Sequence, residues 1–307
     1  MNSPSSVGPL AFGTVRGASP LGRWSYTVWR PPRLHGLIDR VWAYDGPSSH
    51  RCKRVFPNGR VELLLNFGES YRLVEGAGAD LCRSAWLSGP QAGPIVLEQP
   101  AHQHVIGVRL RPAGSYAVVA RPMHETAGLS LDLADLIGTE ACDLLERCET
   151  VTSLESRFRV LAEWIVRRSA RTRGMDKAVA WTVAQLDASG GAAPIAALRE
   201  RTGLSKTRFV RAFRDQVGLA PKRYGRILRF RQTLGQLQSA GSARLTNVAL
   251  DALYYDQAHM NAEFRALGGV TPRAFLAGRH PVGDGSTMSE GPPAPGLFSK
   301  TSVDVGI

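Results

Sequence analysis

Cationic side chains gather on one face of a helix predicted for residues 206–216. At about 100° per residue, Thr207, Arg211 and Arg214 lie opposite the apolar face of this helix. Arginine can form two parallel hydrogen bonds with a guanine edge, and Lys or Arg can neutralise phosphates. The pattern therefore predicts a helix that enters the major groove of double-stranded DNA. The candidate DNA-binding residues are Ser205, Lys206, Thr207, Arg208, Val210, Arg211 and Arg214.

The pattern occurs a second time, because Ile195–Tyr224 and Thr246–Phe275 align without a gap at an offset of 51 residues. Such a repeat indicates that one structural unit is used twice. The second face is less basic, and its Asn and Gln side chains suit adenine edges. We therefore expect weaker and less specific DNA contacts from the second unit. Its candidate DNA-binding residues are Gln257, Ala258, His259, Asn261, Ala262 and Arg265.

Each copy has the sequence signals of a helix-turn-helix unit. In the first copy, Pro194 begins a short helix, Gly203 lies in a tight turn, and Ser205 caps the second helix. Asp256 is the corresponding cap in the second copy. A long helix at 221–239 would hold the two units at a fixed separation. RNA is a poorer partner than DNA, because its deep and narrow major groove excludes helices.

The net charge of +12 is concentrated on the segment that carries the repeat. Residues 171–281 hold 18 Lys and Arg against 7 Asp and Glu, whereas residues 1–170 hold 19 against 16. A basic segment joined to a near-neutral one indicates a polyanionic partner for the basic part. The alternative is a solvated basic surface that binds no nucleic acid, but a duplicated and capped basic unit favours DNA.

The N-terminal region is predicted to be rich in β-strands. Short apolar runs alternate with turn signals from residue 26 to residue 111, and Pro57-Asn58-Gly59 predicts a tight turn between two strands. Such frequent turns suit a small barrel or sandwich. Short helices are expected at 131–137 and 142–145. Longer ones are expected at 153–168, with Ser153 as its cap, and at 175–188.

His102 and His104 have the spacing of a metal-binding pair on a strand. A metal site would need further ligands, for which Glu62 and Glu98 are candidates, and surface histidines are the preferred interpretation. The sequence contains no identifiable Ser/His/Asp series, paired carboxylates or phosphate-binding glycine loop. We therefore assign no catalytic residue, no metal site and no cofactor, and we do not expect an enzyme.

The cysteines and the apolar runs bear on cellular location. The four cysteines form no Cys-x-x-Cys pair, and we expect them to be reduced and mostly buried. Residues 1–13 lack the pattern of a signal peptide, and no uncharged apolar run reaches about 18 residues. We therefore expect a cytoplasmic protein that does not bind membranes.

The two units resemble the AraC/XylS family of bacterial transcription regulators. The motifs that carry the resemblance are Leu198–Ser205 and Gly218–Tyr224 in the first unit, and Asp256–Phe264 and Gly269–Phe275 in the second. The resemblance implies two helix-turn-helix units joined by a long helix. It also implies that two recognition helices enter successive major-groove segments roughly 34 Å apart.

Two positions depart from the family pattern, and both belong to the second unit. Leu253 stands where a turn glycine is usual, and Ala262 stands where a basic residue is usual on the recognition helix. The N-terminal region is similar to the β-rich sensor domain of one AraC-like branch, through Arg54–Leu63 and Gly107–Pro112. That similarity implies an unidentified small-molecule effector or a protein partner. RNA polymerase and a second copy of the chain, in a homodimer, are further candidate partners.

The predicted fold class is α+β, with a β-rich barrel or sandwich followed by an all-α domain. The expected ranges are a disordered segment at 1–20, a sensor domain at 21–168, a linker at 169–174, a double helix-turn-helix domain at 175–280 and a disordered tail at 281–307. The predicted function is sequence-specific DNA binding in transcription regulation. Two alternatives stay open: a cupin-like metal-binding enzyme with a helical accessory domain, and a ligand-independent regulator whose N-terminal domain binds protein.

Overall fold

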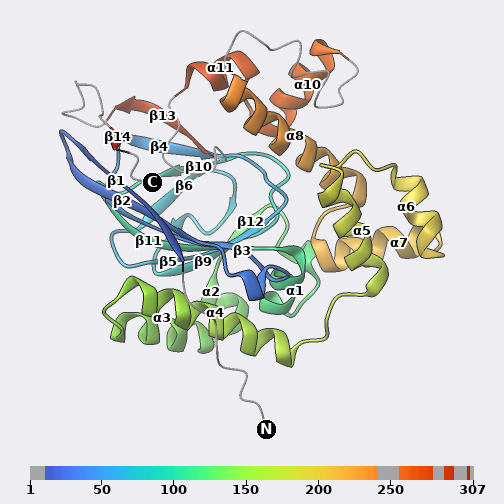
Figure 1. Cartoon of the computed structure of the whole chain (residues 1–307), viewed down its shortest axis with the longest axis horizontal. Coiled ribbons are helices and arrows are strands. Elements are labelled where there is room, and N and C mark those ends of the chain that lie inside the picture. The colour runs from blue at the N-terminus through green and yellow to red at the C-terminus, as the bar shows by residue number, and fades with distance from the viewer. Residues whose placement is uncertain (1–10, 241–255, 279–286, 294–302, 305–307) are drawn as a thin grey trace.

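The computed structural model describes residues 11–240, 256–278, 287–293 and 303–304, and it consists of a β-rich part and a helical part (Figure 1). The strands are β1 (Phe12–Ser19), β2 (Gly22–Trp29), β3 (Ile38–Pro47), β4 (His50–Val55), β5 (Val61–Asn66), β6 (Tyr71–Glu75), β7 (Ala77–Gly78), β8 (Leu81–Cys82), β9 (Ala85–Ser88), β10 (Ile95–Glu98), β11 (His102–Leu110), β12 (Leu129–Asp132), β13 (Thr287–Pro293) and β14 (Val303–Asp304).

The strands form two sheets that pack as a sandwich. The larger sheet has the order β14-β1-β2-β3-β11-β5-β9-β12-β7, and the smaller has the order β13-β4-β10-β6-β8. The prediction of a β-rich N-terminal domain is confirmed, and of the two expected architectures the sandwich is the correct one, because the sheets do not close into a barrel.

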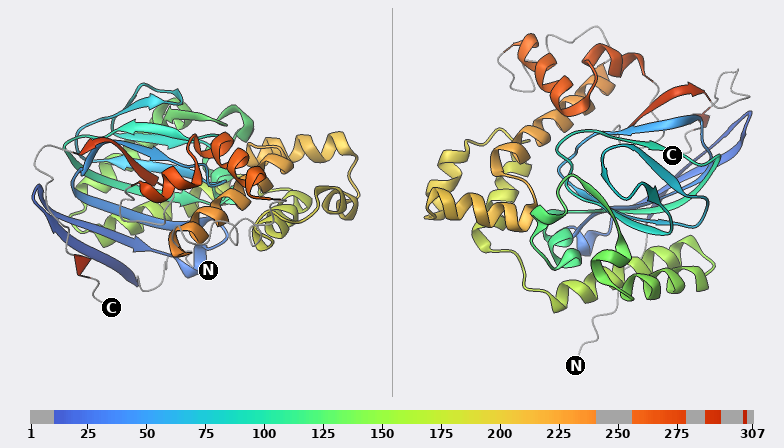
Figure 2. Two further views of the ribbon diagram at one scale, coloured as in Figure 1. Left: turned by 90° about the horizontal axis from the view of Figure 1, so that it is seen from above. Right: turned by 180° about the vertical axis from the view of Figure 1, so that it is seen from behind.

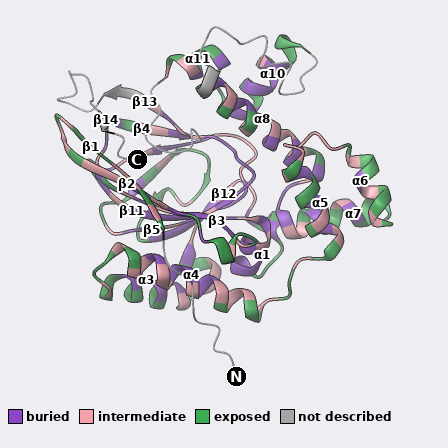
Figure 3. Cartoon of the chain, in the orientation of Figure 1, coloured by how far each residue is buried: buried purple, intermediate pink, exposed green. Residues whose placement is uncertain are grey.

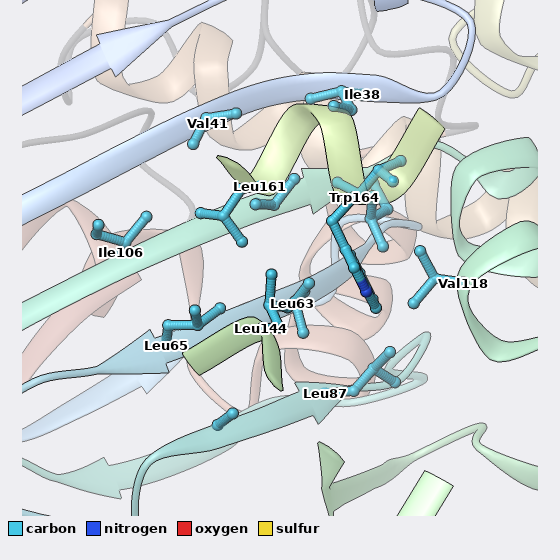
Figure 4. Packing of buried hydrophobic residues seen from close by; sticks show 14 of the residues in the cluster. Ile38, Val41, Leu63, Leu65, Leu87, Ile106, Val118, Leu144, Leu161 and Trp164 are labelled. Atoms are coloured by element: carbon cyan, nitrogen blue, oxygen red, sulfur yellow. The ribbon is translucent and has the colours of Figure 1, made fainter. Parts of the chain in front are cut away.

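Alternation along the central strands separates two interiors. On β5, Val61, Leu63 and Leu65 are buried on the face that packs against helices, while Glu62 and Leu64 face the smaller sheet. Figure 4 shows the helix-facing core, in which Leu63 and Leu65 lie near Leu144, Leu161 and Trp164. Burying side chains of this kind stabilises the fold by about 1.5–3 kcal/mol each.

The helices are also distributed in two groups. The first group covers the sandwich and comprises α1 (Pro112–Val119), α2 (Leu133–Ile137), α3 (Glu140–Thr150) and α4 (Leu154–Arg171), with the short 3-10 helices η1 (Pro32–Leu34) and η2 (Met123–Glu125). The second group comprises α5 (Lys177–Ala188), α6 (Ile195–Thr202), α7 (Lys206–Val217), α8 (Pro221–Ala240), α10 (Gln257–Gly268) and α11 (Pro272–Ala277).

Local capping explains most of the helix starts. Ser153 accepts a hydrogen bond from the backbone N–H of Ser156, as the predicted cap of α4. The helix expected at 131–137 begins only at Leu133, because Leu131 belongs to β12. There Asp132 accepts a hydrogen bond from the N–H of Ala134 and fixes the first turn of α2. Helix α4 continues to Arg171, into the range expected as linker.

Both segments expected to be disordered contain strands. Strand β1 pairs along its whole length with β2, and the Phe12 ring lies 5.7 Å from that of Phe158. At the other end of the chain, β13 pairs with β4 and β14 pairs with β1. Composition suggested disorder at 1–20 and 281–307, but β1 pairs with the next strand, and β13 and β14 pair with distant strands. These pairings supply the backbone hydrogen bonds that short segments lack alone.

The turn at Pro57-Asn58-Gly59 connects two different sheets. Strand β4 pairs with β10 and β13, whereas β5 pairs with β11 and β9. The predicted strand–turn–strand order is correct, but the turn is a corner of the sandwich and not a hairpin. All of its residues are buried, because the helical part covers them.

The second group of helices packs around a separate hydrophobic core, to which Phe56 also belongs, and lies at the edges of the sandwich. Figure 2 shows from two further directions that α5, α6 and α7 lie at one edge, and that α10 and α11 lie near β13, with α8 running between them. Figure 3 shows that these helices keep exposed outer faces. Among the described residues, no helix has both the length and the apolar character needed to span a membrane.

The four thiols differ in their exposure, which predicts a reactivity order. All are free, with Cys142 exposed and Cys82 and Cys148 buried. Burial raises the pKa of Cys82 and that of Cys148 to about 11. Because a raised pKa leaves little thiolate at pH 8, iodoacetamide should modify Cys142 much faster than either buried thiol. Mass spectrometry of the folded protein over time measures the order, and rapid labelling of Cys148 would contradict it.

Candidate nucleic-acid interface

The first helix-turn-helix unit is built as the sequence predicts. Helix α6 ends at Gly203, whose φ of 69° is in the left-handed region that glycine adopts without strain. After a short turn, Ser205 accepts a hydrogen bond from the N–H of Arg208 and caps α7. No acidic side chain lies in the first turn of α7, so the positive end of the helix dipole is not neutralised.

Helix α7 has an apolar inner face and a cationic outer face. Phe209, Phe213 and Val217 are buried. Phe213 and Val217 pack in the helical core, and the Phe209 ring lies 6.4 Å from that of Phe213. Val210 is half-buried. The other predicted residues of the first unit are all exposed: Ser205, Lys206, Thr207, Arg208, Arg211 and Arg214. The structure thus brings them together on one accessible surface, while their DNA contacts stay a prediction.

The cations of this face are held weakly. The Arg211 guanidinium lies 3.7 Å from the Asp215 carboxylate, one turn further along the helix, and the arginine side chain is 84% exposed. Exposed pairs of this type contribute little stability, about 0.3–0.5 kcal/mol. Arg211 can therefore exchange Asp215 for a phosphate or a base edge at small cost.

The second unit has the same construction and a different surface. Asp256 caps α10 by accepting a hydrogen bond of 2.7 Å from the N–H of His259. Met260 and Phe264 are buried on the inner face. Asn261 is half-buried, and the remaining predicted residues are exposed: Gln257, Ala258, His259, Ala262 and Arg265. The outer face thus carries one arginine, where α7 carries three arginines and a lysine. The departure at Leu253 lies outside the described residues.

The repeat seen in the sequence is also a repeat in the backbone. Gly218 ends α7 with φ 88°, and its N–H bonds the carbonyl of Arg214 at 2.9 Å. Gly269 ends α10 with φ 70°, and its N–H bonds the carbonyl of Arg265 at 2.9 Å. Both recognition helices therefore begin with a capping side chain and end with a left-handed glycine.

Helix α8 links the two units through its buried side chains. Tyr224, Ile227, Leu228 and Leu234 are buried as predicted. Phe230, also on α8, lies 4.9 Å from Phe264 of α10 between ring centroids. The Tyr224 ring lies 5.8 Å from that of Phe213 on α7. Helix α8, which we call the spine helix, is thus attached to both recognition helices, α7 and α10.

A residue pair that sequence reasoning missed joins α8 to α10. The guanidinium of Arg226 donates a hydrogen bond to the carboxylate of Glu263, which is buried beneath the second recognition helix. Nothing in the sequence indicated that Glu263 is buried, because a charged residue on a helix is usually exposed. The ion pair fixes the rotation of α10 on the spine helix, because a buried carboxylate needs its partner.

The residues considered for a metal site are not brought together. His102 and His104 lie 2.9 Å and 3.7 Å from Asp45, and His104 also contacts the guanidinium of Arg157 at 3.1 Å. Glu62 lies between the two sheets, where it accepts hydrogen bonds from Trp42 and Arg109. Glu98 pairs with Arg51. Within the described ranges, no group of three His, Cys, Asp or Glu side chains could hold a metal ion.

Two family models match the chain. Residues 198–278 match a family described as a helix-turn-helix domain, and residues 30–132 match one described as a domain of unknown function, DUF6597. The first match covers most of the first unit and all described residues of α8, α10 and α11. No curated protein matches the sequence.

Several solved structures are similar in fold at low sequence identity. A crystal structure of ToxT from Vibrio cholerae O395 is 7% identical, with a TM-score of 0.37 over 87% of this chain and 97% of that one. Wild-type ToxT from V. cholerae strain SCE256, bound to an unsaturated fatty acid, is 9% identical, with a TM-score of 0.42 over 76% and 93%. The AraC-like transcriptional activator CuxR is 15% identical, with a TM-score of 0.30 over 70% and 82%. Likenesses this low assign neither a ligand nor a partner to this chain.

Proposed function

We propose that this chain, which carries an AraC-type helix-turn-helix domain behind a β-rich N-terminal domain, is a transcription regulator that reads two successive major-groove segments of DNA. The observation that carries the proposal is the outer face of α7. Lys206, Arg208, Arg211 and Arg214 are exposed there together, beside a capped helix N-terminus that can bind a phosphate. Helix α10 has the same capped backbone, with fewer cations on its outer face.

The two recognition helices contribute unequally in this proposal. The face of α7 supplies both phosphate contacts and guanine recognition, because arginine can do either. The face of α10 offers Gln257, His259, Asn261 and Arg265, which are fewer cations and more amides. We therefore propose that the first unit supplies most of the affinity for DNA, and that the second unit mainly sets the position of the protein along the DNA.

The N-terminal domain is the proposed site of control, by a small molecule or by a partner. Between the two sheets, Tyr71 and Trp86 form a buried aromatic cluster with Trp42 and Tyr44 beside it. Trp42 and Tyr44 are only half-buried although they lie on a central strand, so the sheets do not cover them completely. Aromatic side chains with a few polar groups are typical of small-molecule sites, and we propose that an effector binds against these rings.

Catalysis is not part of the proposal. The helix-turn-helix match indicates regulation rather than enzymatic turnover. His102 and His104, the two histidines with metal-ligand spacing, pair with Asp45 and Arg157 in a solvent-exposed polar cluster.

The function is tested by selecting bound sequences from random double-stranded DNA and measuring the affinity of the full chain for them at several salt concentrations. The logarithm of the affinity should fall linearly with the logarithm of the salt concentration, with a slope of about −0.9 for each phosphate neutralised. If no sequence is enriched, or if binding does not depend on salt, the proposed function is wrong.

Substitution of Arg211 tests the role of α7. Arg211→Ala should weaken binding to the selected sequence by about 1–3 kcal/mol and relax the preference at particular base pairs, because a bidentate contact is lost. Arg159→Ala removes the same charge from the exposed side of α4 and is the matched control. Equal losses in the two variants would show that net charge, and not base recognition, determines the effect.

A gain of binding tests the role of α10. Ala262→Arg places a cation on the exposed face of the second recognition helix, and it should strengthen DNA binding and steepen the salt slope by about 0.9. Ala134→Arg on α2 adds the same charge to the N-terminal domain as a control. An unchanged slope for Ala262→Arg would mean that α10 does not approach the phosphates.

A further inference from the structure

The N-terminal domain supplies a side chain to the core of the helical domain. Phe56, directly after β4, is 1% exposed and belongs to the cluster of buried residues that includes Val183, Phe213 and Phe264. Its ring lies 6.1 Å from Phe230 of α8 and 5.6 Å from Phe275 of α11. The aromatic core of the second unit is therefore complete only when the N-terminal domain is in place.

Four residues further on, Arg60 attaches the same corner to the first unit. Its guanidinium donates a hydrogen bond of 2.8 Å to the Asp187 carboxylate at the end of α5, and a second to the Tyr224 hydroxyl of α8. Tyr224 in turn donates to Asp187 at 2.9 Å. Burial lowers the pKa of Arg60, but Tyr224 and Asp187 outweigh it, so the pKa is raised and the side chain stays charged.

The corner between these residues, Phe56–Arg60, is shaped for this contact. Gly59 has φ 71°, and a Cβ on it would lie 3.1 Å from the Tyr224 ring. Asn58 accepts a hydrogen bond of 2.8 Å from the N–H of Arg60, which closes the turn. A residue with a side chain at Gly59 would be strained in its backbone and would press against the spine helix.

A second loop of the N-terminal domain, Pro90–Pro94, contacts the ends of both recognition helices. A Cβ on Gly218, at the end of α7, would lie 2.4 Å from the ring of Pro90. A Cβ on Gly269, at the end of α10, would lie 3.3 Å from the ring of Pro94. Between the two prolines, the carbonyl of Ala92 accepts a hydrogen bond from Arg223 of α8. Equivalent positions of the repeat are thus held by one short loop.

The strand that follows the second unit adds another attachment. Strand β13 pairs with β4, and Thr287 lies opposite Val55, directly before the corner. Met288 is 7% exposed and packs in the helical core, where it approaches Gly278 at the end of α11. The second unit is therefore attached to the N-terminal domain at two places. Phe56 packs in its core, and β13, which follows the unit in sequence, pairs with β4.

These contacts leave the outer faces of α7 and α10, which are proposed to bind DNA, uncovered. The N-terminal domain contacts the C-terminal ends of α7 and α10, at Gly218 and Gly269. The capped N-terminal halves remain exposed, including Thr207 on α7 and Ala258 on α10. The docked arrangement is therefore compatible with DNA binding.

We propose that the N-terminal domain acts as a splint: the corner Phe56–Arg60 and the loop Pro90–Pro94 hold the two helix-turn-helix units at one fixed separation. The DNA-related consequence of this inference rests on the proposed function. Two linked units bind DNA more tightly than either unit alone only while their separation matches the spacing of the two sites. A change in the N-terminal domain then alters DNA binding through the separation of α7 and α10, without any contact between that domain and DNA.

The separation can be measured without DNA. Nitroxide labels at Thr207→Cys and Ala258→Cys occupy equivalent exposed positions of the two units, in a full chain that also carries Cys142→Ser and Cys52→Ser. Pulsed electron–electron double resonance should give one narrow distribution of the distance between the two nitroxides. Adding Phe56→Ala, or the milder Phe56→Leu, should broaden it, because the core contact to the second unit is lost. Arg51→Ala, at a 70% exposed side chain on β4, the strand before Phe56, should leave the distribution unchanged.

The DNA measurement separates the two proposals. For the unlabelled chain, Phe56→Leu should weaken binding to a two-segment site by about tenfold while protection of the first segment persists, because a loose link lowers the effective concentration of the second unit. A distance distribution as narrow in both Phe56 variants as in the parent would overturn the splint, whatever the DNA result. A parent chain that is rigid but binds no DNA would contradict only the proposed function.

Discussion

The arrangement of this molecule depends on a buried guanidinium. Arg60 has a side chain that is 2% exposed, and its compensation comes from Asp187 and Tyr224 on the other domain. Breaking a buried pair by removing one partner is strongly destabilising, because a charge is left without water and without a counter-charge. Separation of the domains is therefore costly unless water reaches all three groups at once. The relative position of the sandwich and the helical domain follows from that constraint.

Around this contact, two copies of one unit present unequal surfaces. Their backbones agree in the capping residue and in the left-handed glycine, at Gly218 and Gly269. Their surfaces do not agree, since Arg211 of α7 corresponds to Ala262 of α10. The shared backbone explains why one loop of the N-terminal domain contacts both units in the same way. In the proposed mode of DNA binding, the unequal surfaces explain why the separation matters, because the weaker second unit would contribute only when the first unit holds it near its site.

Local signals predicted the helical domain well. The Ser205 and Asp256 caps, the turn at Gly203 and the buried stripe of α8 each depend on residues a few positions apart. The exposed cationic face followed from helical periodicity alone. By contrast, the pairing of β13 with β4, the Arg60–Asp187 ion pair and the burial of Phe56 join residues more than 100 positions apart. The Pro57-Asn58-Gly59 signal specified a turn correctly, but a turn sequence does not tell which sheets its two strands join.

DNA cleavage from an iron chelate, attached in turn at Thr207→Cys and at Ala258→Cys, tests whether the two recognition helices read successive segments of one DNA face. We expect two cleavage centres on one DNA face, separated by one helical turn, about 34 Å, and each specific to one attachment position. Cleavage at the same centre from both positions, or cleavage from Thr207→Cys only, would contradict it.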